Sequence, residues 1–217
     1  LHLLADMVLR PTFHKKETDK ELTVILDEIE SYNDSPSELI YDDFENMIFE
    51  GSSLAMPILG TKKTLRHISK SPDIALNWMK THYRPERMVL FVLGNVSTQQ
   101  VIASAERELG ELYSSASSTS RTSSTSLTSS TSSLSRTYRR HTHQTHIMLG
   151  SHAYPIGHPK QLTMYLLNNI LGGGSMSSRL YLSLREKYGL VYNIDSQAVP
   201  LSDTGYWNIY LACEPQH

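Results

Sequence analysis

The sequence predicts an α+β protein of two domains, and three observations lead to this prediction. Residues 1–113 show mostly helical periodicity, with one strand-like apolar run at residues 88–96. A Ser/Thr-rich stretch follows at residues 114–137. Residues 138–217 then combine strand-like stretches with one helix. We therefore expect two domains in which helices cover a mostly antiparallel sheet, both of them incomplete in this chain.

Apolar residues at helical spacing, with Ser, Asn, Gly or Pro at the ends, locate the helices. Residues 52–70 give a mixed signal, which we interpret as a loop followed by a short basic stretch through Arg66 and His67. Gly172-Gly-Gly lacks the Gly-Lys-Ser/Thr ending of a phosphate loop, so it predicts a tight loop close to another backbone. The helices are expected at residues 1–10, 15–32, 37–48, 71–83, 97–112 and 161–171.

Four stretches have the length and composition of strands, namely residues 88–96, 138–149, 191–198 and 204–212. The first is continuously apolar, so we expect it to be buried. In the second, alternation places His141 and His143 on one face and His146 on the other. Three histidines this close are compatible with a metal site. However, no acidic residue or Cys lies nearby, so polar side chains on an edge strand are the favoured interpretation.

The stretch at residues 114–137 contains 13 Ser and 6 Thr. Such a segment cannot bury enough apolar surface to offset the entropy lost on ordering. We interpret it as a flexible linker between a first domain at residues 1–113 and a second domain at residues 138–217.

The overall composition narrows the classes of function. The net charge is −2, so we expect no nucleic acid as the main partner. The longest apolar run has the length of a strand, well short of the roughly 18 residues of a membrane span. Cys213 is the single cysteine, which excludes an internal disulfide framework and fits a reducing compartment, so we expect a cytoplasmic protein.

The helix at residues 15–32 carries the first candidate for chemistry. Glu21 and Glu28 are seven residues apart, which places them within about 20° of each other on the flank of the apolar stripe. Val24 lies beyond them on the same side, so we expect both carboxylates to be partly buried and to need a cation, a donor or a metal. The plainer alternative is an acidic N-terminal half that favours the helix dipole, and spacing alone favours it.

Three groups of residues carry a resemblance that covers nearly the whole chain apart from the linker. They are residues 3–13 with 20–29, Gly60-Thr61 with 83–90 and 94–96, and 171–180 with 184–192 and 203–205. In this order and spacing they resemble the pitrilysin/insulinase family of zinc metallopeptidases, above all its two-domain bacterial and mitochondrial-processing-type members. The resemblance implies two domains of the same type.

In this family two His of an H-x-x-E-H helix and a Glu of a later helix bind zinc. The resemblance implies that Glu28 is the third zinc ligand and that Glu21 is the neighbouring acid, which orients the ligating histidines. Zinc lowers the pKa of a bound water, the motif Glu takes its proton, and hydroxide attacks the peptide carbonyl.

The H-x-x-E-H motif itself does not occur in this sequence. His14-Lys-Lys-Glu17 comes nearest, but Thr18 stands where the second His would be. In the family the motif precedes the helix of Glu28, so we expect it upstream of Leu1. This chain alone, with one zinc ligand of three and no general base, is expected to be inactive.

The resemblance also implies roles for Arg185 and Tyr192, which follow the glycine loop. The second domain of the family closes over the substrate. There Arg185 would pair with a substrate carbonyl or carboxylate, and Tyr192 would donate to the oxyanion. The alternative is that Arg185 pairs with a surface acid such as Glu186 and that Tyr192 is half-buried in a strand.

We therefore expect part of a zinc metallopeptidase that hydrolyses short unfolded peptides in a closed chamber. Its substrate would bind as an added β-strand at a sheet edge, and a homodimer or heterodimer is compatible with this expectation. One alternative is a peptidase-like subunit without zinc that supports a catalytic partner. The other is a binding module that collects metal on His141 and His143.

Overall fold

The computed structural model describes residues 1–71, 73–84, 87–113, 134–140 and 142–216. The contacts divide the chain into two compact units. Unit 1 is drawn from Leu1–Asp27 and Gly60–Thr122, and unit 2 from Glu28–Leu59 and Ser123–His217. Most of the predicted linker lies outside the described residues, so the domain boundaries 1–113 and 138–217 stay a prediction.

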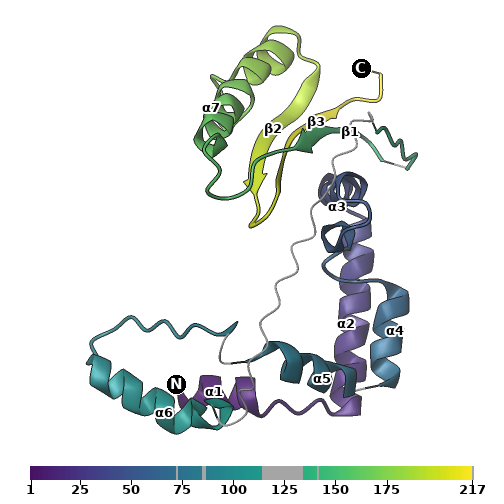
Figure 1. Cartoon of the computed structure of the whole chain (residues 1–217). Helices are drawn as coiled ribbons and strands as arrows, with labels where there is room; N and C mark the ends of the chain where they lie inside the picture. Colours follow the sequence, from purple (N-terminus) through teal and green to yellow (C-terminus); the bar gives the residue numbers. More distant parts are fainter. Residues whose placement is uncertain (72, 85–86, 114–133, 141, 217) are drawn as a thin grey trace. The chain divides into compact units, whose positions relative to one another are not determined.

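Unit 1 contains only helices among its described residues. They are α1 (His2–Leu9), the first part of α2 (Lys15–Asn33), α4 (Lys62–Lys70), α5 (Asp73–His82) and α6 (Thr98–Tyr113) (Figure 1). At the start of α6, the hydroxyl of Ser97 accepts a hydrogen bond from the backbone N–H of Gln100, as expected for a cap. Helix α4, which we expected only as a basic stretch, begins at a capping box formed by Thr61 and Thr64.

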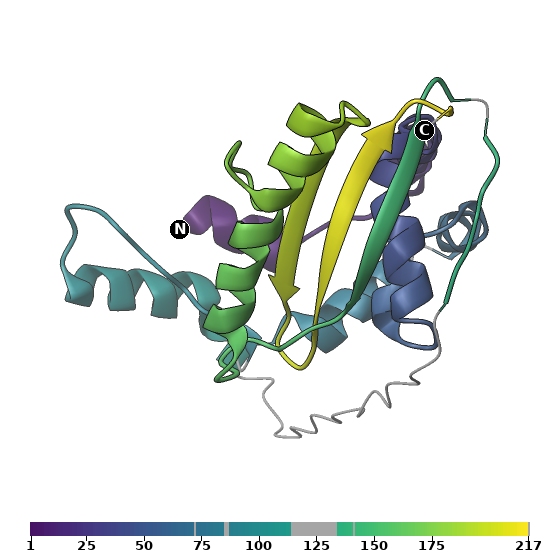
Figure 2. The ribbon, with the colours of Figure 1, turned by 90° about the horizontal axis from the view of Figure 1, so that it is seen from above.

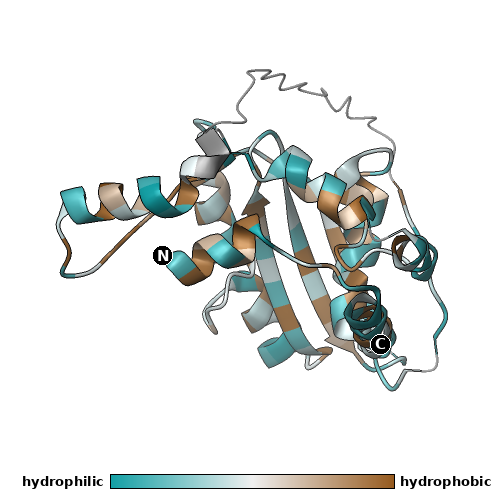
Figure 3. Ribbon diagram, turned by 90° about the horizontal axis from the view of Figure 1, so that it is seen from below, coloured by the Kyte–Doolittle hydropathy of each residue, from teal (hydrophilic) through white to brown (hydrophobic). Residues whose placement is uncertain are grey.

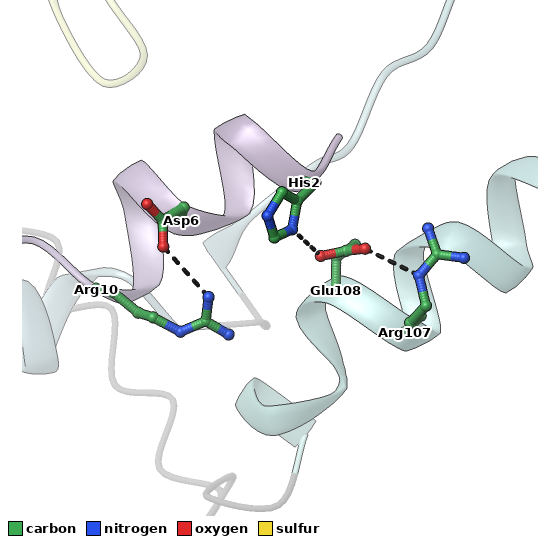
Figure 4. A network of polar contacts seen from close by, with 5 residues as sticks. All are labelled: His2, Asp6, Arg10, Arg107 and Glu108. Atoms are coloured by element: carbon green, nitrogen blue, oxygen red, sulfur yellow. Dashed lines mark hydrogen bonds and ion pairs between the residues drawn. The ribbon is translucent and has the colours of Figure 1, made fainter.

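Polar contacts connect α1 to α6 in unit 1 (Figure 4). His2 Nδ1 lies 2.7 Å from a carboxylate oxygen of Glu108, whose other oxygen accepts a hydrogen bond from Arg107. The buried apolar side chains of this unit are few, and they are Ala5, Leu22 and Leu65. The described part of unit 1 therefore has a smaller buried apolar core than that of unit 2.

The buried strand predicted at residues 88–96 is wrong. This segment is extended, but it forms no β-ladder with any described residue. Val89 is 95% exposed and Leu93 90% exposed. An apolar run forms a strand only where a neighbouring backbone pairs with its N–H and C=O groups, and the described part of the chain offers none here.

Unit 2 is built on a three-stranded antiparallel sheet in the order β1-β3-β2 (Figure 2). The strands are β1 (Thr145–His152), β2 (Val191–Pro200) and β3 (Gly205–Cys213). The remaining elements are α3 (Pro36–Ile48), η1 (Ser53–Ala55), α7 (Gln161–Leu171) and η3 (Tyr181–Lys187). The predicted α+β class with an antiparallel sheet is confirmed, although β1 begins at Thr145 rather than at residue 138.

Alternation along β3 separates the two faces of the sheet, and hydropathy alternates along the strands (Figure 3). On one face, Tyr206 and Tyr210 contact Phe44 and Tyr41 of α3. On the other face, Ile209 packs against the cluster formed by η3 and β2. Residues from the first fifty of the chain therefore cover one face of the C-terminal sheet.

The glycine loop after α7 comes close to another backbone, as predicted. A Cβ on Gly172 would lie 2.8 Å from the Cβ of Ser196 on β2, so a larger residue would push the helix away from the sheet. Among the described residues, no helix combines the length and the apolar character needed to cross a membrane.

Candidate functional site

The acidic pair on α2 faces solvent. Leu22 is buried and anchors the apolar stripe, whereas Glu21, Val24 and Glu28 are all exposed. The expectation that the two carboxylates are partly buried is therefore wrong for the described chain. Val24 is 58% exposed, because no described residue covers this side of the helix. The two carboxylates are exposed for the same reason.

Glu21 and Glu28 differ from the acids that precede them on the same helix. Glu17 pairs with Lys20 at 3.2 Å, and Asp19 accepts hydrogen bonds from Ser69 and Lys15. The hydrogen bond from Ser69, followed by that from Lys15, lowers the pKa of Asp19. Neither Glu21 nor Glu28 forms a hydrogen bond or an ion pair with any described residue, so both carboxylates are open to an external partner.

The described residues bring no three potential metal ligands together. His141 lies outside the described residues. His143 is exposed and precedes β1, while His146 turns toward the α3 side of the sheet, where Tyr210 contacts it. The donors of the described residues therefore do not fit a complete zinc site, and Glu28 could supply one ligand.

The second candidate group lies where η3 passes into β2 in unit 2. Helix η3 is a π-helix that contains Arg185, and π-helical turns occur frequently at functional sites. The guanidinium of Arg185 lies 5.0 Å from the centre of the Tyr181 ring. The alternative ion pair with Glu186 is not formed in the described structure, so the side chain has no carboxylate partner.

Tyr192 sits at an irregularity of β2. The register of β2 against β3 shifts between Val191 and Asn193, so Tyr192 is the extra residue of a bulge. Its ring is exposed, and its hydroxyl donates a hydrogen bond to Glu214, which raises the pKa of the phenol. The alternative of a half-buried strand residue does not describe it. Arg185 and Tyr192 have different partners and do not contact each other.

Sequence reasoning missed the polar layer between α3 and the sheet. The hydroxyl of Tyr206 donates to Glu45 of α3, and His146 Nδ1 lies 2.8 Å from the hydroxyl of Tyr210. Burial lowers the pKa of His146 and raises that of Tyr206. Asn208 lies between the two tyrosines on β3, fully buried, and neither polar atom of its amide has a partner among the described residues. No local pattern predicts these pairs, because they join residues more than sixty positions apart.

Family comparisons give the context of these residues. Residues 71–217 match the family described as "Peptidase M16 inactive domain", and residues 1–62 match "Insulinase (Peptidase family M16)". The chain belongs to the insulinase family of peptidases, family M16. The predicted resemblance is thereby confirmed.

The relatives of this M16 chain include named zinc proteases. It is 34% identical over 210 residues to "Uncharacterized zinc protease YmxG" of Bacillus subtilis, covering 97% of this chain and 49% of the relative. It is 25% identical to the "Mitochondrial-processing peptidase subunit beta" of Bos taurus, covering 99% of this chain and 44% of that protein. The chain therefore spans about half the length of the curated relatives it matches.

Solved structures share the fold. A protease from Helicobacter pylori matches with a TM-score of 0.80 at 19% identity, over 99% of this chain and 51% of its own. A structure described as the peptidase M16 inactive domain from Pseudomonas fluorescens matches with a TM-score of 0.74 at 22% identity, over 98% of this chain and 50% of its own.

Proposed function

We propose that this chain is part of a zinc-dependent endopeptidase that hydrolyses short unfolded peptides in a closed chamber. The observation that carries the proposal is the pair of unpaired, exposed carboxylates on α2 in a chain of family M16. In this proposal Glu28 is a zinc ligand and Glu21 is the acid beside it. An oxygen ligand with no competing partner in its own chain is available to a metal.

The remaining zinc ligands and the general base are not supplied by this sequence. It has no H-x-x-E-H, and its described residues hold no group of three potential ligands. We therefore propose that the chain alone does not hold catalytic zinc and is inactive. Its contribution within the whole protein is one metal ligand together with residues that position the substrate.

Arg185 and Tyr192 are proposed as those substrate-positioning residues. The guanidinium of Arg185 contacts the Tyr181 ring and forms no ion pair with a described residue, which leaves its donors free for a substrate carbonyl or carboxylate. Tyr192 is exposed at a bulge, a feature that often turns a side chain toward a site. Its hydroxyl donates to Glu214 and would have to exchange that acceptor for the oxyanion.

The test measures zinc content and peptide cleavage in the protein as its own gene encodes it. Glu28→Gln should remove most of the bound zinc and lower kcat/KM by at least about a hundredfold. Glu17→Gln, on the same helix but paired with Lys20, is the matched control and should keep both. Full zinc occupancy in Glu28→Gln would remove Glu28 from the metal site.

A second test separates substrate positioning from metal binding. Arg185→Ala and Tyr192→Phe should each lower turnover of a peptide substrate by about ten- to a hundredfold while the zinc content stays unchanged. Normal turnover in both variants would return these residues to a purely structural role.

A peptidase-like subunit without its own activity is the second candidate function. The description "inactive domain" for the family matched by residues 71–217 favours it, as does the name of the bovine relative as one subunit of a peptidase. The two candidates differ in one measurement. A whole protein that binds no zinc, yet raises the activity of a separate catalytic chain, would be such a subunit.

A further inference from the structure

Helix α4 carries a row of basic side chains that neither the family membership nor the proposed function uses. Five of its nine residues are Lys, Arg or His, and none is acidic. Leu65 is buried on the side that faces the chain, while Lys63, Arg66 and Lys70 are exposed on the opposite side. The helix is therefore divided cleanly into an apolar side and a cationic side.

The three exposed cations form a continuous row. They lie at positions i, i+3 and i+7, so they point within about 60° of one another along about 10 Å of the helix. We call these three residues the α4 basic row. His67 lies beside the row and is also exposed.

The three side chains of the α4 basic row have no counter-charge paired with them in the described part of the chain. Some cations of unit 1 are neutralised close by, since Lys15 pairs with Asp19 and Lys20 pairs with Glu17. Lys63, Arg66 and Lys70 form no ion pair or hydrogen bond through their side chains with the described residues. In a chain whose net charge is −2, this local excess of positive charge favours an external acidic partner.

We propose that the α4 basic row is a docking surface for an acidic segment of a protein. A helical segment with carboxylates at i, i+3 or i+4, and i+7 repeats the spacing of the row and can meet it one charge to one. This interaction is separate from the proposed peptidase chemistry, because the row shares no residue with the metal ligand or with the substrate-positioning residues.

The geometry favours an acidic protein segment over a membrane or a nucleic acid. The apolar side of α4 is turned inward at Leu65, so the helix has no apolar surface left to insert between lipids. The row spans only about 10 Å of helix, so it could contact only a few phosphates of a nucleic acid. A short acidic segment meets neither obstacle.

The experiment measures binding of a fluorescent helical peptide that carries Glu at i, i+3 and i+7, by anisotropy at low salt. The variant Lys63→Glu/Arg66→Glu/Lys70→Glu should bind at least about tenfold more weakly than the unchanged chain. The variant Lys160→Glu/Arg179→Glu/Lys187→Glu makes the same charge change at exposed residues of unit 2, and it should bind within about twofold. Raising the salt should weaken binding to the unchanged chain.

Several results would overturn the proposal. They are an equal loss in both variants, equal binding of a peptide with Gln in place of Glu, or no binding by the unchanged chain. Tighter, α4-dependent binding of oligothymidylate, or of vesicles containing phosphatidylserine, would replace the acidic segment by that class of partner. If charge reversal disturbs the helix by circular dichroism, Lys63→Gln/Arg66→Gln/Lys70→Gln provides the same comparison. None of these readouts depends on zinc or peptide cleavage, so failure here leaves the proposed function untouched.

Discussion

Helices α2 and α3 are both acidic and amphipathic, yet they present their acids to different surroundings. On α2, Glu21 and Glu28 are exposed and have no partner among the described residues. On α3, Asp43 pairs with Arg140, and Glu45 accepts a hydrogen bond from Tyr206. Burial raises the pKa of Asp43 and of its neighbour Asp42.

This difference shows that acidic residues on a helix can serve either packing within the chain or binding to an external partner. Asp43 and Glu45 of α3 lie at the edge of a packed layer, where Arg140 and Tyr206 satisfy them, so these two acids help to hold the helix in place. On α2, by contrast, Glu21 and Glu28 form no hydrogen bond or ion pair with a described residue, although Glu17 and Asp19 on the same helix are paired. Exposed carboxylates without a partner are available for binding, which is the reason the proposed metal ligand is placed on α2 rather than on α3.

The sharpest contrast between the two helices is expected in stability. Phe44→Ala removes a buried ring of α3 that packs against Tyr206, and it should lower the free energy of unfolding by about 3–5 kcal/mol. Val24→Ala removes an exposed side chain of α2 and should change it by less than about 0.5 kcal/mol. Urea denaturation of the chain measures both. Similar small values would mean that α3 does not pack on the sheet.

Two buried amides test the polar layers on either face of the sheet. Asn168 on α7 is satisfied, because its amide N–H donates to the carbonyl oxygen of Ser196 and its oxygen accepts from the Ser196 hydroxyl. Asn168→Leu should therefore lower the free energy of unfolding by about 2–3 kcal/mol. Asn208 is buried without partners on the α3 side, so Asn208→Leu should raise it by about 1 kcal/mol.

Urea denaturation measures the free energy of unfolding of both variants. Because leucine is close to asparagine in shape, the difference reports mainly on the lost hydrogen bonds of the amide. A loss of stability in Asn208→Leu that matches the loss in Asn168→Leu would show that the Asn208 amide is satisfied in solution.

The smallest expected effect concerns the pH dependence of α3. Burial, followed by the nearby Glu45 and Asp43, raises the pKa of Asp42 above its ordinary value of 3.8. The folded state therefore binds this proton more tightly than the unfolded state, and the contribution of Asp42 to stability falls as the pH rises through the raised pKa. Asp42→Asn should stabilise the chain by up to about 1 kcal/mol at pH 7 and by nothing below about pH 3.

Thermal unfolding of the two proteins from pH 3 to pH 7 provides the measurement. A stabilisation by Asp42→Asn that persists at pH 3 would assign the effect to something other than ionisation.

Prediction succeeded where the signal is local and failed where a partner is needed. Ser97 caps α6 and Gly172 meets β2 closely, because a cap and a close approach follow from one or two residue types. Residues 88–96 have the composition of a buried strand, yet Val89 and Leu93 are exposed. A strand depends on a second backbone, and the apolar pattern of one segment carries no information about whether that backbone is present.

The candidate residues divide in the same way. The seven-residue spacing of Glu21 and Glu28 follows from helical geometry, so their common side of α2 was predictable, whereas their exposure was not. The positions of Arg185 on a π-helix and Tyr192 at a bulge were also not predictable, because each irregularity arises where η3 and β2 meet the rest of unit 2.

The sequence by itself determined six of the helices, the Ser97 cap of α6, the three C-terminal strands, the α+β class and the family. All of these depend on periodicity and on residue types at short spacing. Only the tertiary structure decided that α3 covers the C-terminal sheet, and that neither Asn208 nor the α4 basic row has a polar partner among the described residues. Burial and pairing depend on which residues, far apart in the sequence, come into contact. The hydrophobic effect that drives this contact is non-directional, so the pattern of one segment does not specify its partner.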